Sequence, residues 1–349
     1  MGHEVRVLSK PLSDFAKEVF VQAGMPPEDA QAEADVLIWA NLRGVDSHGV
    51  LRIPWYVANI DKEIMNPKPN IRVEKETYAT LLIDADSALG AVVTTFAMNR
   101  VMEKAKKMGI GWALIRNLTH QGALGYYSLM AAKRGMAGIT FVCSPPNMVP
   151  YGAKATGVSN NPIAISVPAR RHRPLILDMA TSVVAGGKLW LAMDKGVPIP
   201  EGWALNNDGS PTTDPRQYNM LLPVGGPKGS GLSIMLECLS SIMANNPLVE
   251  PVLRGEEPIG RVIQNSVVAA VDIGMFTDLG NYKEHVDSLI DGLKALPKAE
   301  GFNEILVPGE PEWRTFDDRS RDGIPLPEGT VDNLRSIAKK FSIELPAGL

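Results

Sequence analysis

The sequence of 349 residues has little cysteine, little histidine and no long apolar run. Its two cysteines, Cys143 and Cys238, lie far apart in apolar surroundings, which predicts buried, reduced thiols and excludes a disulfide framework. No cluster of histidine and cysteine occurs at metal-ligand spacing, so we expect no metal site. Neither a signal-peptide pattern nor 18 consecutive apolar residues are present, so we expect a cytoplasmic protein without a membrane partner.

The chain also lacks a strong excess of charge of either sign. Its 35 basic and 39 acidic residues give a net charge of −4 and a pI near 5.8, without a dense basic block. This balance excludes nucleic acid as the main partner and favours a small-molecule substrate. A content of 45% apolar residues is enough to bury a large core, as one elaborate domain or two subdomains.

Two common phosphate-binding motifs are missing, namely the dinucleotide fingerprint G-x-G-x-x-G and the P-loop. The nearest features are Gly-Gly-Lys-Leu at 186–189 and the glycine-rich segment 225–231, where Lys228 adds a charge. The second segment enters a helix whose free backbone N–H groups could cradle a phosphate, or it is simply a turn. A phosphate-binding transferase and a non-catalytic binding protein are therefore alternative functions. Both are disfavoured, because no metal-binding carboxylates adjoin the segment and the candidate catalytic residues below are present.

Hydrophobic periodicity predicts a helical start followed by alternating helices and strands. A helix opens at Pro26-Pro27 with acidic residues in its first turn and ends at Gly44. Predicted strands cover 79–84, 109–115, 137–143, 163–167, 175–177 and 266–273, and predicted helices cover 92–107, 124–134, 229–244, 282–296 and 329–341. This order predicts an α/β (α+β) protein in which helices pack on a sheet.

His48 and Arg52 are the clearest candidates for chemistry. In a helix they would lie about 6 Å apart along the axis on one face; in an extended chain they would lie about 13 Å apart. An arginine fork holds a carboxylate by two hydrogen bonds, and an imidazole passes protons near neutral pH. The alternative is a histidine satisfied by backbone groups beside a solvated arginine. The pair predicts chemistry on a small acid with a carbonyl or hydroxyl group.

Seven segments, taken in order along the chain, resemble the malate/L-lactate dehydrogenase family, which is distinct from the Rossmann-type lactate and malate dehydrogenases. They are Asp-Ser-His-Gly at 46–49 with Arg52, 117–123, Ser144 with 149–152, Asn161-Pro162, 177–180, 212–215 and 225–231. The similarity extends from about residue 10 to about residue 345. The family also includes ureidoglycolate and sulfolactate dehydrogenases, diketogulonate reductases and cyclic imino acid reductases.

The resemblance implies a fold in two parts. A helical part of residues 1–75, joined by residues 305–349, would hold substrate and form a dimer. A mixed-sheet domain of residues 76–304, not of Rossmann type, would bind NAD(P), and the C-terminal helix would return to the helical part. Family members are usually homodimers with the site near the interface.

The resemblance also implies roles for individual residues. His48 and His120 would handle the proton, with Ser47 in the same motif as His48; His48 is our preferred donor, and the opposite assignment stays open. Arg52 would hold the substrate carboxylate. The implied cofactor-binding residues are Ser144, Asn161, Asp178, Met179, Ala180, Lys228, Gly309 and Glu310. The implied reaction is hydride transfer between NAD(P)H and a small 2-hydroxy/2-oxo acid such as malate, lactate, ureidoglycolate or sulfolactate. Reduction of a cyclic or linear 2-imino acid by NADPH is the alternative.

Several finer assignments remain expectations. The basic run at 169–174 could receive the 2′-phosphate of NADPH through Arg170 or Arg171, which favours NADP over NAD, or it is a solvated β-turn. Substrate choice would depend on Thr119, Met148 and Tyr151. The remaining histidines, His3, His172 and His285, are expected at the surface.

Overall fold

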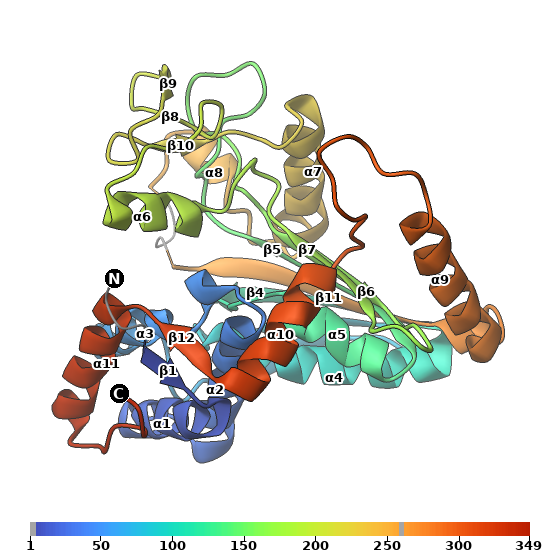
Figure 1. The fold of residues 1–349 in the computed structure, drawn as a ribbon, viewed down its shortest axis with the longest axis horizontal. Helices are drawn as coiled ribbons and strands as arrows, with labels where there is room; N and C mark the ends of the chain where they lie inside the picture. The colour runs from blue at the N-terminus through green and yellow to red at the C-terminus, as the bar shows by residue number, and fades with distance from the viewer. Residues whose placement is uncertain (1–4, 258–261) are drawn as a thin grey trace.

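A seven-stranded mixed sheet forms the centre of the computed structural model, which describes residues 5–257 and 262–349 (Figure 1). In spatial order its strands are β2 (Arg72–Glu76), β3 (Thr80–Asp84), β4 (Ile110–Leu118), β11 (Gln264–Asp272), β5 (Met136–Cys143), β6 (Ile163–Val167) and β7 (Leu175–Met179). β3 and β4 are parallel, and the other neighbouring pairs are antiparallel. The predicted mixed sheet with packed helices is confirmed.

Two helices, α4 (Gly90–Met108) and α5 (Gly125–Lys133), cover one face of the sheet. Glycines in the strands allow this close packing. A Cβ at Gly111 would lie 2.0 Å from the carbonyl oxygen of Val101, and one at Gly138 would lie 2.2 Å from that of Ser128. Because any side chain at these two positions would push the helices away, the strand glycines fix how α4 and α5 sit against the sheet.

On the other face lies α7 (Pro227–Glu237), which continues as a π-helical turn, Cys238–Ile242. The predicted helix over 229–244 is therefore interrupted in its hydrogen-bonding pattern. Cys143 is buried as expected, but Cys238 is exposed, so that part of the cysteine prediction is wrong. A further helix, α9 (Leu279–Lys294), lies at the end of the sheet near the β6–β7 hairpin.

The two ends of the chain pack together in a separate helical core. α1 (Ser9–Gln22), α2 (Pro27–Leu42), α3 (Ile53–Asp61) and α11 (Glu328–Phe341) share it, and β1 (Val5–Val7) pairs with β12 (Ile324–Leu326). Leu12, Val19, Leu37 and Leu334 are fully buried there, and each such side chain contributes roughly 1.5–3 kcal/mol. The predicted return of the C-terminal helix is confirmed. The boundaries at residues 75 and 305 stay a prediction.

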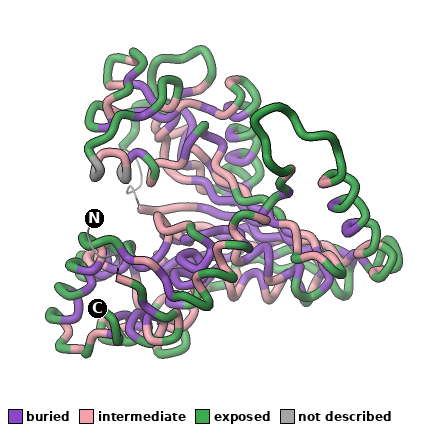
Figure 2. Tube along the Cα trace, in the orientation of Figure 1, coloured by how far each residue is buried: buried purple, intermediate pink, exposed green. Residues whose placement is uncertain are grey.

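The remaining elements complete the molecule around the sheet. They are α6 (Gly186–Lys195), β8 (Ala204–Leu205), β9 (Pro211–Thr212), β10 (Met220–Leu221), α8 (Glu250–Leu253) and α10 (Glu310–Asp322), with short 3-10 helices at Asp46–His48, Val50–Arg52 and Ile273–Met275. Figure 2 shows buried residues concentrated along the sheet and its helices, whereas the loop after α9 is exposed. Within residues 5–257 and 262–349, no helix is long and apolar enough to cross a membrane.

Candidate active site

The segment that carries His48 and Arg52 consists of two short 3-10 helices, Asp46–His48 and Val50–Arg52, joined at an extended Gly49. The helical spacing expected from the sequence is therefore broken at Gly49. The cause is Asn41, whose side-chain oxygen accepts the N–H of Val50 at 2.8 Å. A Cβ at position 49 would lie 2.2 Å from that same oxygen, so only glycine fits. We call residues 46–52 the catalytic turn.

The structure brings His48, Arg52 and His120 together. The rings of His48 and His120 are stacked, with centroids 5.4 Å apart and an interplanar angle of 19°. Arg52 Nε donates to the carbonyl oxygen of Ser47 at 2.7 Å, and Ser47 Oγ lies 2.9 Å from His48 Nδ1. His120 arrives from a different element, the loop after β4. Two imidazoles and a guanidinium thus converge from segments about 70 residues apart in sequence.

Tyr56 and Trp55 of α3 complete this cluster. Tyr56 Oη lies 2.6 Å from His120 Nδ1, and the backbone N–H of Gly122 donates to the same nitrogen at 3.3 Å. Because an amide N–H can only donate, Nδ1 is an acceptor and the ring hydrogen is on Nε2. Sequence reasoning missed Tyr56. Its position four residues after Arg52 was the available signal, because α3 continues directly from the catalytic turn.

Both histidines are neutral at pH 7. Burial lowers the pKa of His48 to about 4, and the charge of Arg52 lowers it further in the same direction. Burial, then Arg52 and His48, hold the pKa of His120 well below its ordinary value. Burial also lowers the pKa of Arg52, which nevertheless remains protonated. The site therefore presents one fixed positive charge beside two uncharged rings.

The first turn of α6 lies directly against the catalytic turn. A Cβ at Gly187 would lie 2.7 Å from Ser47 Cβ, whereas one at Gly186 would meet nothing within 4 Å. Gly187 therefore has no room for a side chain, because the backbone of the catalytic turn lies directly behind Ser47 Cβ. Of the two glycines in the segment 186–189 that came nearest to a P-loop in the sequence, Gly187 packs on the catalytic turn and Gly186 is open.

Three of the predicted cofactor-binding segments meet at one edge of the sheet. Ser144 follows β5, Asn161 precedes β6, and Met179 ends β7 opposite Ile163. The N–H of Val142 donates to Pro162 O at 3.1 Å, and that of Thr181 to Asn160 O at 2.9 Å. Because β5, β6 and β7 are neighbouring strands, the end of β5, the start of β6 and the end of β7 lie side by side. We call these adjoining strand ends the polar edge.

This edge fits a ligand that offers hydrogen-bonding groups. Asn161 Oδ1 and Thr181 Oγ1 are both buried and have no hydrogen-bond partner among the residues that the structure describes. Buried polar atoms are rarely left unpaired without a ligand or water. The start of α7 packs against the polar strand ends, since a Cβ at Gly229 would lie 2.5 Å from Thr181 O. The neighbouring Lys228 is exposed. Thr181 was not predicted, although it directly follows the 178–180 segment.

Asp178 and Gly309 lie at a second corner of the same region. Asp178 Oδ2 accepts the N–H of Gly125, at the start of α5, at 2.7 Å. Desolvation of its carboxylate against the start of α5 raises the pKa of Asp178 to about 6, partly offset by the Gly125 bond and by Arg43, although the residue as a whole is exposed. Gly309, with φ +86°, packs on Ile176 of β7. Glu310 is held by Lys294 at 2.6 Å and by Arg314, so its carboxylate already has two cationic partners.

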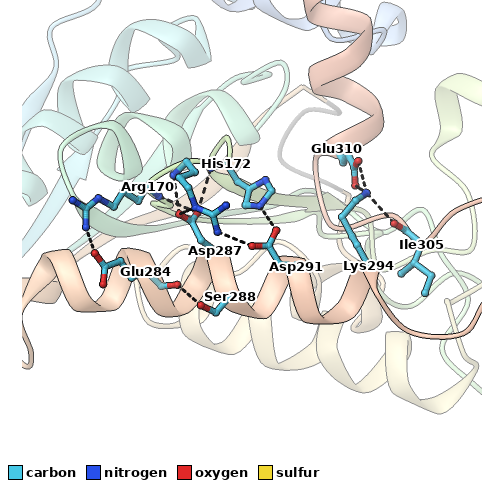
Figure 3. A network of polar contacts seen from close by, with 10 residues as sticks. Arg170, His172, Glu284, Asp287, Ser288, Asp291, Lys294, Ile305 and Glu310 are labelled. Atoms are coloured by element: carbon cyan, nitrogen blue, oxygen red, sulfur yellow. Dashed lines mark hydrogen bonds and ion pairs between the residues drawn. The ribbon is translucent and has the colours of Figure 1, made fainter.

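The basic run lies at the turn of the β6–β7 hairpin, at the opposite end of β7 from Asp178 (Figure 3). Asp287 accepts the backbone N–H groups of Arg170, Arg171 and His172. The Arg170 side chain pairs with Glu284, and both Arg171 and His172 pair with Asp291 of α9. The turn is thus a docked element of the fold, and its arginines are already paired with acids.

The residues expected to select substrate fall into two groups. Thr119 and Met148 are fully buried; the Thr119 hydroxyl donates to Ala88 O, and Met148 belongs to a core cluster with Val158. Neither offers surface to a substrate in this structure. Tyr151 is 68% exposed. Of the surface histidines, His285 is exposed, His172 is paired as described, and His3 lies outside the described residues.

Across residues 5–257 and 262–349, no group of three or more histidine, cysteine, aspartate or glutamate side chains could hold a metal ion. The titratable groups of the cluster are the stacked imidazoles and Tyr56, and Arg52 adds a fixed positive charge. Together with the polar strand edge, this arrangement is suited to general acid–base chemistry, on a mixed-sheet fold that has no glycine fingerprint.

The comparisons with known proteins identify the family. A model described as malate/L-lactate dehydrogenase matches residues 7–335, and the chain belongs to this family. It is 39% identical to an L-sulfolactate dehydrogenase of Methanocaldococcus jannaschii, over 94% of this chain and 95% of that protein. It is also 39% identical to a malate dehydrogenase of Pyrococcus horikoshii, over 97% and 96%. The solved malate dehydrogenase of Entamoeba histolytica matches with a TM-score of 0.94 at 29% identity, covering 99% of this chain and 100% of that one.

These findings confirm the family and the fold expected from the sequence, and the protein is a dehydrogenase of this family. Dehydrogenases of this family use a nicotinamide cofactor.

Proposed function

We propose that this protein transfers hydride between NAD(P)H and a small 2-oxo acid that carries a second anionic group, giving a 2-hydroxy acid of the malate or sulfolactate type. The single observation that carries the proposal is the convergence of His48, His120 and Arg52 in one cluster. Malate and sulfolactate, after which the relatives are named, both have a carboxylate beside the reacting carbon and a further acid group.

The chain's own residues divide the work as follows. Arg52 binds and orients the carboxylate next to the reacting carbon. His120, with its hydrogen on Nε2, donates a hydrogen bond to the reacting oxygen while remaining neutral, as a neutral imidazole can. His48 transfers the proton at that same oxygen. The bound nicotinamide supplies or accepts the hydride.

The low pKa of His48 acts differently in the two directions. In oxidation the neutral ring that prevails at pH 7 accepts the hydroxyl proton; in reduction the ring must first take a proton from solvent, and only its small protonated fraction donates to the reacting oxygen. Ser47 orients the ring through Nδ1, which leaves Nε2 for the reacting oxygen. Tyr56 holds His120 in the required tautomer.

The residues that would hold the cofactor lie at the polar edge and at its second corner. They are Ser144, Asn161, Asp178, Met179, Ala180, Lys228, Gly309 and Glu310. The carboxylate of Glu310 would act while it is paired with Lys294. Thr181 joins this set because its buried hydroxyl has no partner among the described residues. Asn161 and Thr181 would contribute hydrogen bonds to polar groups of the cofactor.

The choice of NADP over NAD depends in this proposal on Arg170 and Arg171, and it requires their pairs with Glu284 and Asp291 to open. The double variant Arg170→Ala/Arg171→Ala tests this. A raised KM for NADPH with an unchanged KM for NADH supports the role. Unchanged constants for both cofactors remove the role.

We also propose a homodimer with the site near the interface. Its support is an apolar face on α7 and the π turn, where five large side chains are 40–55% exposed: Ile234, Met235, Leu239, Ile242 and Met243. Apolar exposure of this extent on one face is typical of an interface.

The decisive experiment follows NAD(P)H consumption at 340 nm with oxaloacetate, sulfopyruvate, pyruvate and a cyclic 2-imino acid. We expect the fastest turnover with one of the two doubly acidic compounds. Turnover confined to the imino acid would replace the proposal by the imino acid reductase alternative. No turnover, together with no quenching of NADH fluorescence on binding, would end the dehydrogenase proposal for these substrates.

A further inference from the structure

Helix α10 lies along the segment that leads into the catalytic turn. Trp313 of α10 stacks on the guanidinium of Arg43, 4.5 Å from its ring centroid, and Glu312 approaches the same group at 4.0 Å. Two further contacts follow at helical spacing. Thr315 packs on Gly44, where a Cβ would lie 3.1 Å from Thr315 Cγ2, and Arg319 reaches Asp46. Residues three and four apart share one face of a helix, so a single face of α10 follows the backbone from position 43 to position 46.

Arg319 makes the most specific of these contacts. Its Nη1 donates to Asp46 Oδ1 at 2.6 Å and its Nη2 to Asp46 Oδ2 at 3.0 Å, the two-pronged geometry that arginine forms with carboxylates. Nη1 also donates to the backbone oxygen of Asn41 at 2.5 Å. The Arg319 side chain is only 16% exposed, whereas that of Asp46 is 40% exposed, so these bonds are shielded from solvent on the arginine side.

Asn41 links the same contact to the other side of the catalytic turn. Its Nδ2 donates to Asp46 Oδ1 at 2.7 Å, and its Oδ1 accepts the N–H of Val50 at 2.8 Å. Arg319, Asp46 and Asn41 therefore hold the turn both before and after His48. We call these three residues the clamp.

The turn needs such support because its own structure is weak. A three-residue 3-10 helix contributes little stability, and Gly49 adds backbone freedom next to His48. Displacement of a reacting group by about 1 Å can cost about 10²-fold in rate. A fixed position for residue 46 thus determines where the His48 ring lies, two residues further on.

We propose that Arg319 is a positioning residue for proton transfer by His48, acting through Asp46 and Asn41. The inference rests on the proposed function for His48. In this proposal Arg319, a side chain in the C-terminal region, affects catalysis without touching substrate or cofactor.

Arg321 provides a matched control on the same helix. Its side chain is 68% exposed and pairs only locally, with Asp318 and Asp322. Exposed pairs of this kind contribute little. Arg321→Ala removes the same charge and volume from α10 without touching the catalytic turn, so it should behave as the wild type.

The kinetic test compares Arg319→Ala, Arg319→Lys and Arg321→Ala. We expect Arg319→Ala to lower kcat by about 10²-fold while the Kd for NADH is unchanged, and added guanidinium ion to restore part of the rate. Lysine, a point charge without the fork, should give an intermediate rate. A wild-type kcat in Arg319→Ala, or a loss that guanidinium does not rescue and that equals the loss of folded protein, would overturn the proposal.

A second test does not depend on turnover. Asp46→Asn keeps the size of the side chain and removes its charge, and the ¹⁵N chemical shifts of the His48 ring report its hydrogen bonding and titration. We expect these shifts to move in Arg319→Ala and Asp46→Asn and to stay at wild-type values in Arg321→Ala. Unmoved shifts in both clamp variants would overturn the proposal. A wild-type enzyme without turnover would instead refute the proposed function, and the shifts would still decide whether the clamp orients His48.

Discussion

At the scale of single residues, the protein keeps two imidazoles uncharged by surrounding them with protein and placing a guanidinium beside them. This combination differs from the alternative that the sequence left open, a histidine satisfied by backbone groups beside a solvated arginine. The sequence predicted that His48, His120 and Arg52 would meet. It could not predict the tautomer of His120, because that depends on Tyr56 and the Gly122 amide, which are brought there by tertiary packing.

The first prediction concerns His48. His48→Ala should lower kcat by about 10²–10⁴-fold, the usual contribution of general acid–base catalysis, with little change in the Kd for NADH. Steady-state and fluorescence measurements test both values. His285→Ala is the control, because His285 is exposed on α9. A kcat for His48→Ala close to that of the control would refute the assignment.

The second prediction is a pH profile. Oxidation of the hydroxy acid needs a neutral His48, whose pKa is lowered to about 4, so kcat/KM should stay constant well below pH 6.5 and fall only toward pH 4. Asp178, with a pKa raised to about 6, is the competing group. Asp178→Asn separates the two, since a fall near pH 6 that disappears in this variant would report Asp178. A fall near pH 6.5 that persists in Asp178→Asn would contradict the prediction.

At the scale of elements, most helices and strands follow from apolar periodicity and from proline and glycine at helix ends. The helix that opens at Pro27 is one example, and Gly44 with φ +77° follows its end. The failures are local and have specific causes. Asn41 imposes the kink at Gly49 through a hydrogen bond between elements, which sequence periodicity does not reveal. Cys238 is exposed where α7 passes into the π turn.

The third prediction tests how α6 meets the catalytic turn. Gly187→Ala places a methyl group 2.7 Å from Ser47 Cβ and must displace the turn or α6. We expect kcat/KM to fall by at least about tenfold, because such a displacement misaligns His48. Gly186→Ala is the control, with open space at its Cβ. Equal kcat/KM values for the two variants would show that α6 moves away without consequence.

The fourth prediction concerns the hairpin turn in Figure 3. Asp287→Asn should lower the free energy of unfolding at pH 7 by about 1–3 kcal/mol, because a buried carboxylate that accepts three backbone N–H groups is lost. Burial alone would raise the pKa of Asp287, but these N–H groups hold it below its ordinary value of 3.8. The difference from wild type is thus present above pH 3.8 and should shrink as the pH falls below it.

Urea unfolding at several pH values measures this difference. Asp291→Asn is the control, because Asp291 is a more exposed partner of Arg171 and His172. A destabilisation by Asp287→Asn that is no larger than that of the control would show that the turn does not depend on the buried carboxylate.

At the scale of the whole molecule, the order of seven motifs sufficed to predict the family, because they extend over nearly the whole chain. The mixed sheet and the return of the C-terminus followed from the same resemblance. Arg319 could not be predicted, because an arginine on a polar helix with five acidic residues carries no sign of its partner 273 positions earlier.

The fifth prediction addresses assembly. Sedimentation equilibrium should give twice the chain mass of 37.7 kDa for the wild type. Met235→Glu should shift the protein toward the monomer, because it inserts a charge into the apolar face of α7. Leu289→Glu on α9 is the control, since Leu289 is 56% exposed outside that face. A monomeric wild type, or a Met235→Glu variant as dimeric as the control, would contradict the proposed interface.

Pairing of Asp46 with Arg319 has a consequence for synthesis on the ribosome. The fork forms only after Arg319 has been made, 273 positions after Asp46. If that bond orients His48 as inferred, a nascent chain cannot transfer hydride efficiently before translation has passed Arg319. Truncated products that end before α10 lack the fork and should turn over substrate poorly, however well their sheet has formed.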